Sequence, residues 1–295
     1  MALMPAAEID VTNDLVQRLL ADQFPDLARL PLVRVANGWD NVTFKLGGEL
    51  AIRLPRREAA ADLLLNEQQW LPSLAPELPV AVPAPVRCGK PSSYYPWSWS
   101  VVPWLEGRAA WRLRAEERRS LTPGLAAFVA ALHVPAPSGA PLNPVRGVPL
   151  SARNAAVLQR LDSGAVPQTE RVAALWRQLS GLPAWDGPAL WLHGDLHPGN
   201  LVVDGTRLAA VIDFGDITAG DPATDLAAAW LVFDAAGRRE FIAAVESRTA
   251  VAPETWQRGR GWALVMATAL LTSSDDNRLL RGVGERALAE VLSGS

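Results

Sequence analysis

One stretch constrains the fold of this chain more than any other: HGDLHPGNLVVDGTRLAAVIDFGD, which begins at residue 193. In it, two apolar runs flank an Asp-Gly pair, and such a pair is typical of a tight hairpin turn. Asp195 and Asn200 precede the hairpin, and Asp213 follows it. Turn capping alone explains the Asp-Gly pair. It does not explain two carboxylates and an amide at the ends of one hairpin.

These three side chains are the parts that phosphoryl transfer needs. One carboxylate orients and deprotonates a hydroxyl, while an amide and a second carboxylate hold Mg²⁺ against nucleotide phosphates. Protein kinases arrange such groups as H-R-D-x-x-x-x-N followed by D-F-G. Here His193-Gly194-Asp195 is followed, after four residues, by Asn200, and Asp213-Phe214-Gly215 completes the pattern.

Together with residues 220–227, GDPATDLA, this pattern resembles the aminoglycoside phosphotransferase family, kinase-like enzymes that act on small molecules. The resemblance covers most of the chain, because upstream features fall in the expected order. It implies that Asp195 is the catalytic base and that Asn200 and Asp213 bind Mg²⁺. ATP or GTP is then the expected phosphate donor.

Four further residues of this region are expected to support the site. His193 is expected to hold the catalytic loop by a hydrogen bond, as the histidine of a kinase H-R-D motif does. Asp216 is expected to assist the metal or the substrate. Asp221 and Asp225 are expected to brace the loop and to cap the helix that starts near residue 224. For His197, inside the loop, solvent exposure is the default expectation.

The pattern of apolar residues and turn signals makes the first third strand-rich and the rest helix-rich. Helices are expected at 12–23, 58–71 (ended by Pro72), 114–132, 151–161, 169–180, 224–235, 238–247, 254–273 and 279–293. Strands are expected at 42–46, 49–54, around 86, at 97–102, and within 189–212. Such a division is what the fold implied by the resemblance would give, so we expect an α+β, two-lobed protein-kinase-like fold. A small nucleotide-binding lobe would span 1–103, and a larger, mostly helical lobe for catalysis and substrate binding would span 104–295.

The strand at 49–54 carries the candidate nucleotide contacts. Because side chains alternate along a strand, Ala51 and Arg53 share one face. In the kinase V-A-I-K strand, the alanine meets adenine and the lysine binds the α- and β-phosphates. This chain has arginine at the lysine position, and arginine can bind phosphate bidentately. Lys45, on the preceding strand, is a weaker candidate, and a solvated Arg53 is the other reading.

A glutamate on the next helix usually orients this cation. Glu67 is preferred for that role over Glu58, and a surface glutamate is the alternative. Upstream, the backbone from Gly38 to Asn41 is expected to form a small anion-binding nest over the phosphates. The segment Pro103-Trp104-Leu105 resembles the hinge that reads the purine edge; Trp104 either flanks that pocket or packs between lobes.

Composition excludes several other classes of function. The formal net charge is −3 over 295 residues, which does not indicate a nucleic-acid or membrane partner. The single cysteine, Cys88, rules out an internal disulfide and suits a reducing cytoplasm. The first residues lack the pattern of a signal peptide, and no apolar run is long enough to span a membrane.

We therefore expect a small-molecule O-phosphotransferase, with antibiotic resistance through aminoglycoside or macrolide acceptors as the leading case. Residues 226–295 contain eight acidic and eight basic residues, a balance that gives no indication of polycation capture. Two alternatives stay open. One is a metabolic kinase for a sugar, an amino alcohol or an amino acid. The other is a nucleotide-binding module without catalytic activity, which Arg53 and the glycine-poor loop favour.

Overall fold

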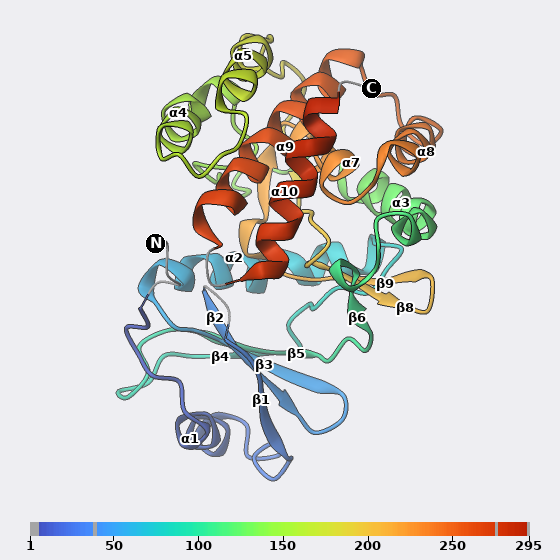
Figure 1. Cartoon of the computed structure of the whole chain (residues 1–295). Helices are drawn as coiled ribbons and strands as arrows, with labels where there is room; N and C mark the ends of the chain where they lie inside the picture. Colours follow the sequence, from blue (N-terminus) through green and yellow to red (C-terminus); the bar gives the residue numbers. More distant parts are fainter. Residues whose placement is uncertain (1–5, 38–39, 275–276, 294–295) are drawn as a thin grey trace. The chain divides into compact units, whose positions relative to one another are not determined.

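The computed structural model describes residues 6–37, 40–274 and 277–293, and the chain forms two compact units. The smaller unit holds residues 6–76 and 81–106, and the larger unit holds 77–80 and 107–293 (Figure 1). Within the described residues, no helix is both long enough and apolar enough to cross a membrane.

The smaller unit is built on a five-stranded antiparallel sheet with the order β1-β2-β3-β5-β4. Its strands are β1 (Leu32–Asn37), β2 (Asn41–Leu46), β3 (Leu50–Pro55), β4 (Arg87–Gly89) and β5 (Trp99–Pro103). The expected hairpin is confirmed as β2–β3. Strand β1 was not expected from the sequence. It is an edge strand whose Val33 and Val35 are exposed, so its apolar residues do not mark a buried face.

The two faces of β3 differ, as side-chain alternation predicts. Ile52 and Leu54 are buried in an apolar core together with residues of α1 (Asn13–Gln23). The Oγ1 atom of Thr12 accepts the N–H of Leu15 at 3.2 Å, which caps α1 at its expected start. Arg53 points from the opposite face of β3 to Glu67 on α2 (Glu58–Leu74).

The expectation that Pro72 ends the helix at 58–71 is wrong, because α2 continues to Leu74 with Pro72 inside it. Proline lacks an N–H and so removes one bond of the helical ladder. Pro72 lies in the last turn of α2 and removes only its own N–H from the ladder. The N–H of the C-cap residue, Ala75, still reaches the carbonyl of Leu71.

The larger unit is mainly helical and contains two small sheets. Its helices are α3 (Thr122–Leu132), α4 (Asn154–Asp162), α5 (Thr169–Ser180), α6 (Ala223–Leu226), α7 (Ala228–Leu231), α8 (Ala235–Glu246), α9 (Pro253–Ser273) and α10 (Arg278–Ser293). Its strands are β6 (Arg108–Ala109), β7 (Leu190–Leu192), β8 (Leu201–Asp204), β9 (Arg207–Val211) and β10 (Thr218–Gly220). Neither β6 nor β10 was expected; each is too short to show a period.

Helix α9 forms the centre of this unit. Most of its side chains are buried, and it packs against α10, which lies beside it in Figure 1, and against α4, α5, α6 and α7. At Gly259, α9 lies close to the backbone of α6, since an added Cβ would be in van der Waals contact with the carbonyl oxygen of Ala223 at 3.4 Å. Helix α9 therefore fixes α6, which carries Asp225.

Two expected helices have different limits. The helix expected at 224–235 is split into α6 and α7, and α8 begins earlier than the expected residue 238. The early start of α8 has a physical reason in Asp234, whose extended backbone and side-chain bond to the Gly237 N–H begin a helix at Ala235. In the helix expected at 114–132, a 3₁₀ turn over Glu117–Leu121 precedes α3. Proline near the start of α3 favours a helix beginning at Thr122.

Candidate active site

The loop between β7 and β8 carries Asp195, and a tight backbone turn gives it its shape. Gly194 has a φ of +88°, a backbone conformation that residues other than glycine rarely adopt. A Cβ at this position would lie 2.5 Å from the carbonyl oxygen of Asp216. The loop therefore lies directly against the segment that follows Asp213.

Asp225, on α6, fixes the start of this loop. Its side chain is fully buried, and its two oxygens accept the N–H groups of His193 and Gly194, each at 2.8 Å. The Nε2 atom of His133, the C-cap residue of α3, lies 3.2 Å from the same carboxylate. Buried carboxylates need such donors to offset the loss of hydration.

His193 joins the loop to the end of the β8–β9 hairpin. Its Nδ1 accepts the N–H of Asp195 at 3.1 Å, so Nε2 carries the ring proton and donates to the carbonyl of Ile212 at 3.0 Å. The ring also packs on Phe214, with centroids 4.5 Å apart. These contacts set the backbone direction on both sides of the site.

Three side chains surround the carboxylate of Asp195. Asn200 donates to the Asp195 carbonyl at 2.9 Å and to Oδ2 at 3.3 Å. The Nε2 atom of His197 lies 3.3 Å from Oδ2, and Nη2 of Arg146 lies 3.4 Å from Oδ1. Burial alone would raise the pKa of Asp195, but His197 and Arg146 outweigh it and hold the pKa below its ordinary value.

Asn200 and Asp213 lie at one end of the β8–β9 hairpin. The N–H of Ile212 donates to the carbonyl of Asn200 at 2.9 Å, so the residue after Ile212 is held beside Asn200. Asp213 itself has a φ of +66°, which turns the chain into the 3₁₀ turn Phe214–Asp216. A non-glycine residue in this conformation is often found at functional sites.

Asp216 is tied to a segment that the sequence patterns did not single out. Its Oδ1 accepts from Nδ2 of Asn143 at 2.7 Å, and its Oδ2 lies 3.3 Å from Nη2 of Arg146. Burial raises the pKa of Asp216, although the charge of Arg146 acts in the opposite direction. His197 also differs from expectation. It is buried, and its Nδ1 accepts the N–H of Gly199 at 3.0 Å.

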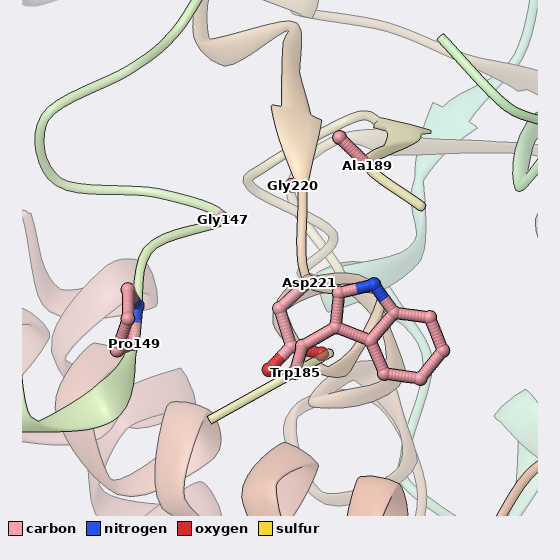
Figure 2. Close-up of a pocket in the computed structure, with 6 residues that line it drawn as sticks. All are labelled: Gly147, Pro149, Trp185, Ala189, Gly220 and Asp221. Carbon is pink, nitrogen blue, oxygen red and sulfur yellow. The ribbon is translucent and has the colours of Figure 1, made fainter. Parts of the chain in front are cut away.

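Asp221 has a different environment. Its carboxylate accepts from Nε of Arg258 at 2.7 Å and from the N–H of Ala223 at 3.0 Å. The Arg258 guanidinium lies 5.6 Å from the ring centre of Trp185. Figure 2 shows a pocket here, lined by Gly147, Pro149, Trp185, Ala189, Gly220 and Asp221. The Asp221 carboxylate in this pocket is already paired, so it braces α6 and α9.

In the smaller unit, Arg53 and Glu67 form a buried ion pair through Nη1 and Oε2. Ala51 is also buried, and it lies opposite Lys45 on β2 and Val102 on β5. Lys45 pairs with the exposed Glu106 at 2.8 Å. Of these two ion pairs, Arg53–Glu67 is buried and Lys45–Glu106 is more exposed, while Glu58 is exposed and belongs to neither. The role of Arg53 and Glu67 toward nucleotide stays a prediction.

The remaining candidates lie at strand ends of the same unit. Asn41 begins β2, and Pro103 ends β5. The N–H of Trp104 donates to the carbonyl of Glu49 at 2.7 Å, and Leu105 follows, partly exposed. Gly38 lies outside the described residues, so the expected anion nest stays a prediction.

The residues that the sequence patterns missed are Arg146 and Asn143, which contact the acidic residues from a distant part of the chain. Forty-nine residues separate Arg146 from Asp195. No spacing rule links two such positions. A local signal for Asn143 is its turn chemistry, since its Oδ1 accepts the N–H of Val145 at 2.9 Å.

A model of the phosphotransferase enzyme family matches residues 31–262. No curated protein matches the chain.

Similar solved structures span nearly the whole chain. The GDP complex of a single-substitution mutant of aminoglycoside 2′-phosphotransferase-IIIa has a TM-score of 0.71 and 19% identity, and the match covers 96% of this chain and 95% of that chain. Macrolide 2′-phosphotransferase MphH from Brachybacterium faecium has a TM-score of 0.63 and 23% identity, with 96% and 98% covered. The streptomycin–ATP–APH(2″)-IIa ternary complex has a TM-score of 0.62 and 17% identity, with 97% and 98% covered. At these identities the matches establish a kinase-like fold.

Proposed function

The chain belongs to the phosphotransferase enzyme family, and from this premise we propose that it transfers the terminal phosphate of ATP or GTP to a hydroxyl group of a small molecule. The observation that carries this proposal is the gathering of Asp195 and Asn200 with the end of β9, where Asp213 follows. These are the groups that kinase-type transfer requires, in the order that it requires.

In the proposed reaction, Asp195 accepts the proton of the acceptor hydroxyl. The acceptor oxygen forms a bond to the γ-phosphorus while the bond from that phosphorus to the bridging oxygen breaks. The nucleoside diphosphate leaves with the electron pair of that bond. The low pKa of Asp195 suits a group that mainly orients the hydroxyl, because the transition state of phosphoryl transfer is loose and needs little base strength.

The residues present fit a Mg²⁺ site of the kinase kind. Within the described part of the chain, no group of three or more His, Cys, Asp or Glu side chains is arranged to hold a metal. Mg²⁺ at kinase sites needs only one or two protein oxygen ligands, because phosphate oxygens and water supply the rest. Asn200 and Asp213 would hold it. When bound, Mg²⁺ neutralises negative charge on the β- and γ-phosphate oxygens.

The donor side of the proposal rests on the smaller unit. Arg53, oriented by Glu67, would bind the α- and β-phosphates, and Ala51 shares its face of β3. The hinge residues Pro103, Trp104 and Leu105 and the strand start at Asn41 are the further proposed nucleotide contacts. Solved structures of similar fold contain GDP or ATP. We accordingly propose residues 1–103 as the nucleotide-binding lobe and 104–295 as the catalytic and acceptor-binding lobe.

For the acceptor, antibiotics are the first candidates to test. Similar structures include enzymes named for aminoglycosides and macrolides. The balance of eight acidic and eight basic residues in 226–295 favours keeping less cationic acceptors in the panel as well, such as sugars and amino acids. The cytoplasm, where nucleotide triphosphates are abundant, is the proposed compartment.

The test is phosphate transfer from ATP and from GTP to a panel of aminoglycosides, macrolides, sugars, amino alcohols and amino acids, with water as the background acceptor. The expected result is Mg²⁺-dependent transfer to at least one acceptor class, reduced at least about a thousandfold in Asp195→Ala. No transfer and no nucleotide hydrolysis by the wild-type chain would instead support a silent nucleotide-binding module.

A further inference from the structure

Arg146 belongs to no motif that the sequence singled out, yet its guanidinium contacts two acidic residues of the site. Nη2 lies 3.4 Å from Oδ1 of Asp195 and 3.3 Å from Oδ2 of Asp216. We propose that Arg146 is a positioning residue for the transfer step, holding Asp195 in the orientation that meets the acceptor hydroxyl. This inference rests on the proposed function.

The backbone on both sides of Arg146 is pinned to the catalytic region. On one side, the N–H of Asn143 donates to Oγ1 of Thr218 at 2.9 Å. On the other, the N–H of Gly147 donates to Oγ1 of Thr224 at 3.1 Å, and its carbonyl accepts the N–H of Asp221 at 3.0 Å. We call residues 143–147 the strap.

The strap holds the backbone of Arg146 in a fixed position. A long side chain loses considerable rotamer freedom when it is held in one place. Anchoring its backbone on both sides narrows the positions that the guanidinium can take. Asn143 is a second residue that holds the Asp216 carboxylate, because its Nδ2 donates to Oδ1 of Asp216 at 2.7 Å. The strap therefore sets Asp216 and, through Arg146, Asp195.

The contacts also indicate which oxygen of Asp195 receives the proton. A carboxylate offers about four lone-pair sites, two on each oxygen. His197 and Asn200 both contact Oδ2, at 3.3 Å each. Arg146 contacts Oδ1, so one site on Oδ1 remains for the acceptor hydroxyl. Arg146 thus determines which way the reactive oxygen points.

Charge gives the second part of the argument. Asp195 and Asp216 are half-buried carboxylates on either side of one guanidinium, and like charges at short range repel each other. The Arg146 guanidinium lies between them and attracts both. Without it, either carboxylate is free to turn away from the other. Misplacement by about 1 Å at a reacting group costs on the order of a hundredfold in rate.

The test uses water as the acceptor, so that it does not depend on knowing the natural one. Arg146→Gln removes the charge and keeps a polar side chain. We expect its rate of Mg²⁺-dependent ATP or GTP hydrolysis to fall about a hundredfold, with nucleotide Kd and melting temperature little changed. Arg146→Lys keeps the charge without the planar fork and is expected to recover part of the rate.

Arg153→Gln is the matched control. Its pKa is lowered by burial and by the charge of Arg146, which places a second arginine in the same neighbourhood. Among the described residues it forms no ion pair with Asp195 or Asp216. The Arg153→Gln variant loses the same positive charge, and we expect it to hydrolyse nucleotide at the wild-type rate. An equal loss in Arg153→Gln would assign the effect to general electrostatics and overturn the proposal.

A double-mutant cycle with Asp216→Asn separates positioning from a general role in folding. If Arg146 acts by holding both carboxylates, its loss should matter less once Asp216 is neutral, so the two effects should not multiply. Two results would refute the positioning role while the proposed function stands. One is an Arg146→Gln variant that hydrolyses nucleotide as fast as wild type. The other is a double mutant whose loss of rate equals the product of the two single losses. An inactive wild-type chain would refute both.

Discussion

Gly194 is a residue of the catalytic loop at which any side chain would disturb the backbone. Its φ of +88° and the 2.5 Å approach of a virtual Cβ to the Asp216 carbonyl act together. Gly194→Ala would add both backbone strain and a clash. We expect a loss of about 2–3 kcal/mol in the free energy of unfolding. We also expect a fall of about a hundredfold in the hydrolysis rate, because Asp195 is displaced.

Gly205→Ala is the control for this prediction. Gly205 also has positive φ, +59°, but nothing lies within 4 Å of an added Cβ there. Gly205→Ala should lower the free energy of unfolding, measured in urea, by about 1 kcal/mol and leave the hydrolysis rate unchanged. Wild-type activity in Gly194→Ala would mean that the turn is not needed for catalysis.

Glu67 carries a prediction about nucleotide binding. Its buried carboxylate pairs with Arg53, and removing one partner of such a pair leaves an uncompensated charge. Glu67→Gln is expected to raise the KM for ATP or GTP about tenfold and to lower stability by about 3 kcal/mol. Steady-state kinetics and urea unfolding measure the two effects. The exposed Glu58, on the same helix, is the control, and Glu58→Gln should behave as wild type.

At this scale the sequence predicted what was local and missed what was distant. The spacing of Asp195, Asn200 and Asp213 around one hairpin was sufficient to predict that they gather, because a hairpin brings its two ends together. Arg146 could not be predicted, since its position depends on contacts of residues 143–147 with Thr218 and Thr224, which are far away in the sequence. His197 was expected in solvent, but the fold of its loop turns the ring toward Asp195.

Among the elements, α8 depends on a single side chain at its start. Asp234 accepts the N–H of Gly237 at 2.8 Å and forms an ion pair with Arg119 on the 3₁₀ turn before α3. The hydrogen bond from Arg119, chiefly, lowers the pKa of Asp234. Asp234→Ala removes the cap and the pair, and is expected to cost about 1–2 kcal/mol at neutral pH.

The sign of the pH dependence follows from that lowered pKa. A carboxylate with a folded pKa below its unfolded value of 3.8 stabilises the fold above pH 3.8, and this contribution is lost as pH falls through the folded pKa. The stability gap between wild type and Asp234→Asn, which can still cap α8, should therefore narrow as pH drops below about 4. Urea unfolding at several pH values measures it. A gap that widens with acid would contradict the assignment.

The same residue explains why element limits were harder to predict than element types. Residues 224–235 are rich in alanine and suit one helix, but α7 ends at Leu231 and the cap at Asp234 starts α8. In α2, the reverse occurred: Pro72 is a strong stop signal, yet it lies late enough in the helix for the last turn to form. Both errors arise because local propensity competes with hydrogen bonds that depend on a few atoms.

At the scale of the whole molecule, the predicted kinase-like fold is confirmed by solved structures that match over 95–97% of the chain. The motif around residues 193–216 led to this prediction, and the change from strand-rich to helix-rich sequence supported it, because each unit has its own periodicity. The compact units divide between Glu106 and Gly107, and residues 77–80 group with the larger unit. Such an excursion of four residues carries no signal in the sequence.

Mg²⁺ and nucleotide should stabilise the whole chain measurably if the proposed site is real. A ligand that binds only the folded chain adds about 2.7 kcal/mol at a concentration one hundred times its Kd. We expect ADP to raise the melting temperature, with a larger rise when Mg²⁺ is present.

Asp213→Asn should keep the rise from ADP alone and lose the additional rise from Mg²⁺, because the substitution removes the carboxylate ligand and leaves the fold intact. Asp204→Asn, on the exposed hairpin turn, is the control for the same charge change and should respond as wild type does. Chelation by EDTA should reduce the wild-type response to that of Asp213→Asn. If Mg²⁺ adds the same increment to both proteins, the metal is held elsewhere, and Asp213 must be given another role.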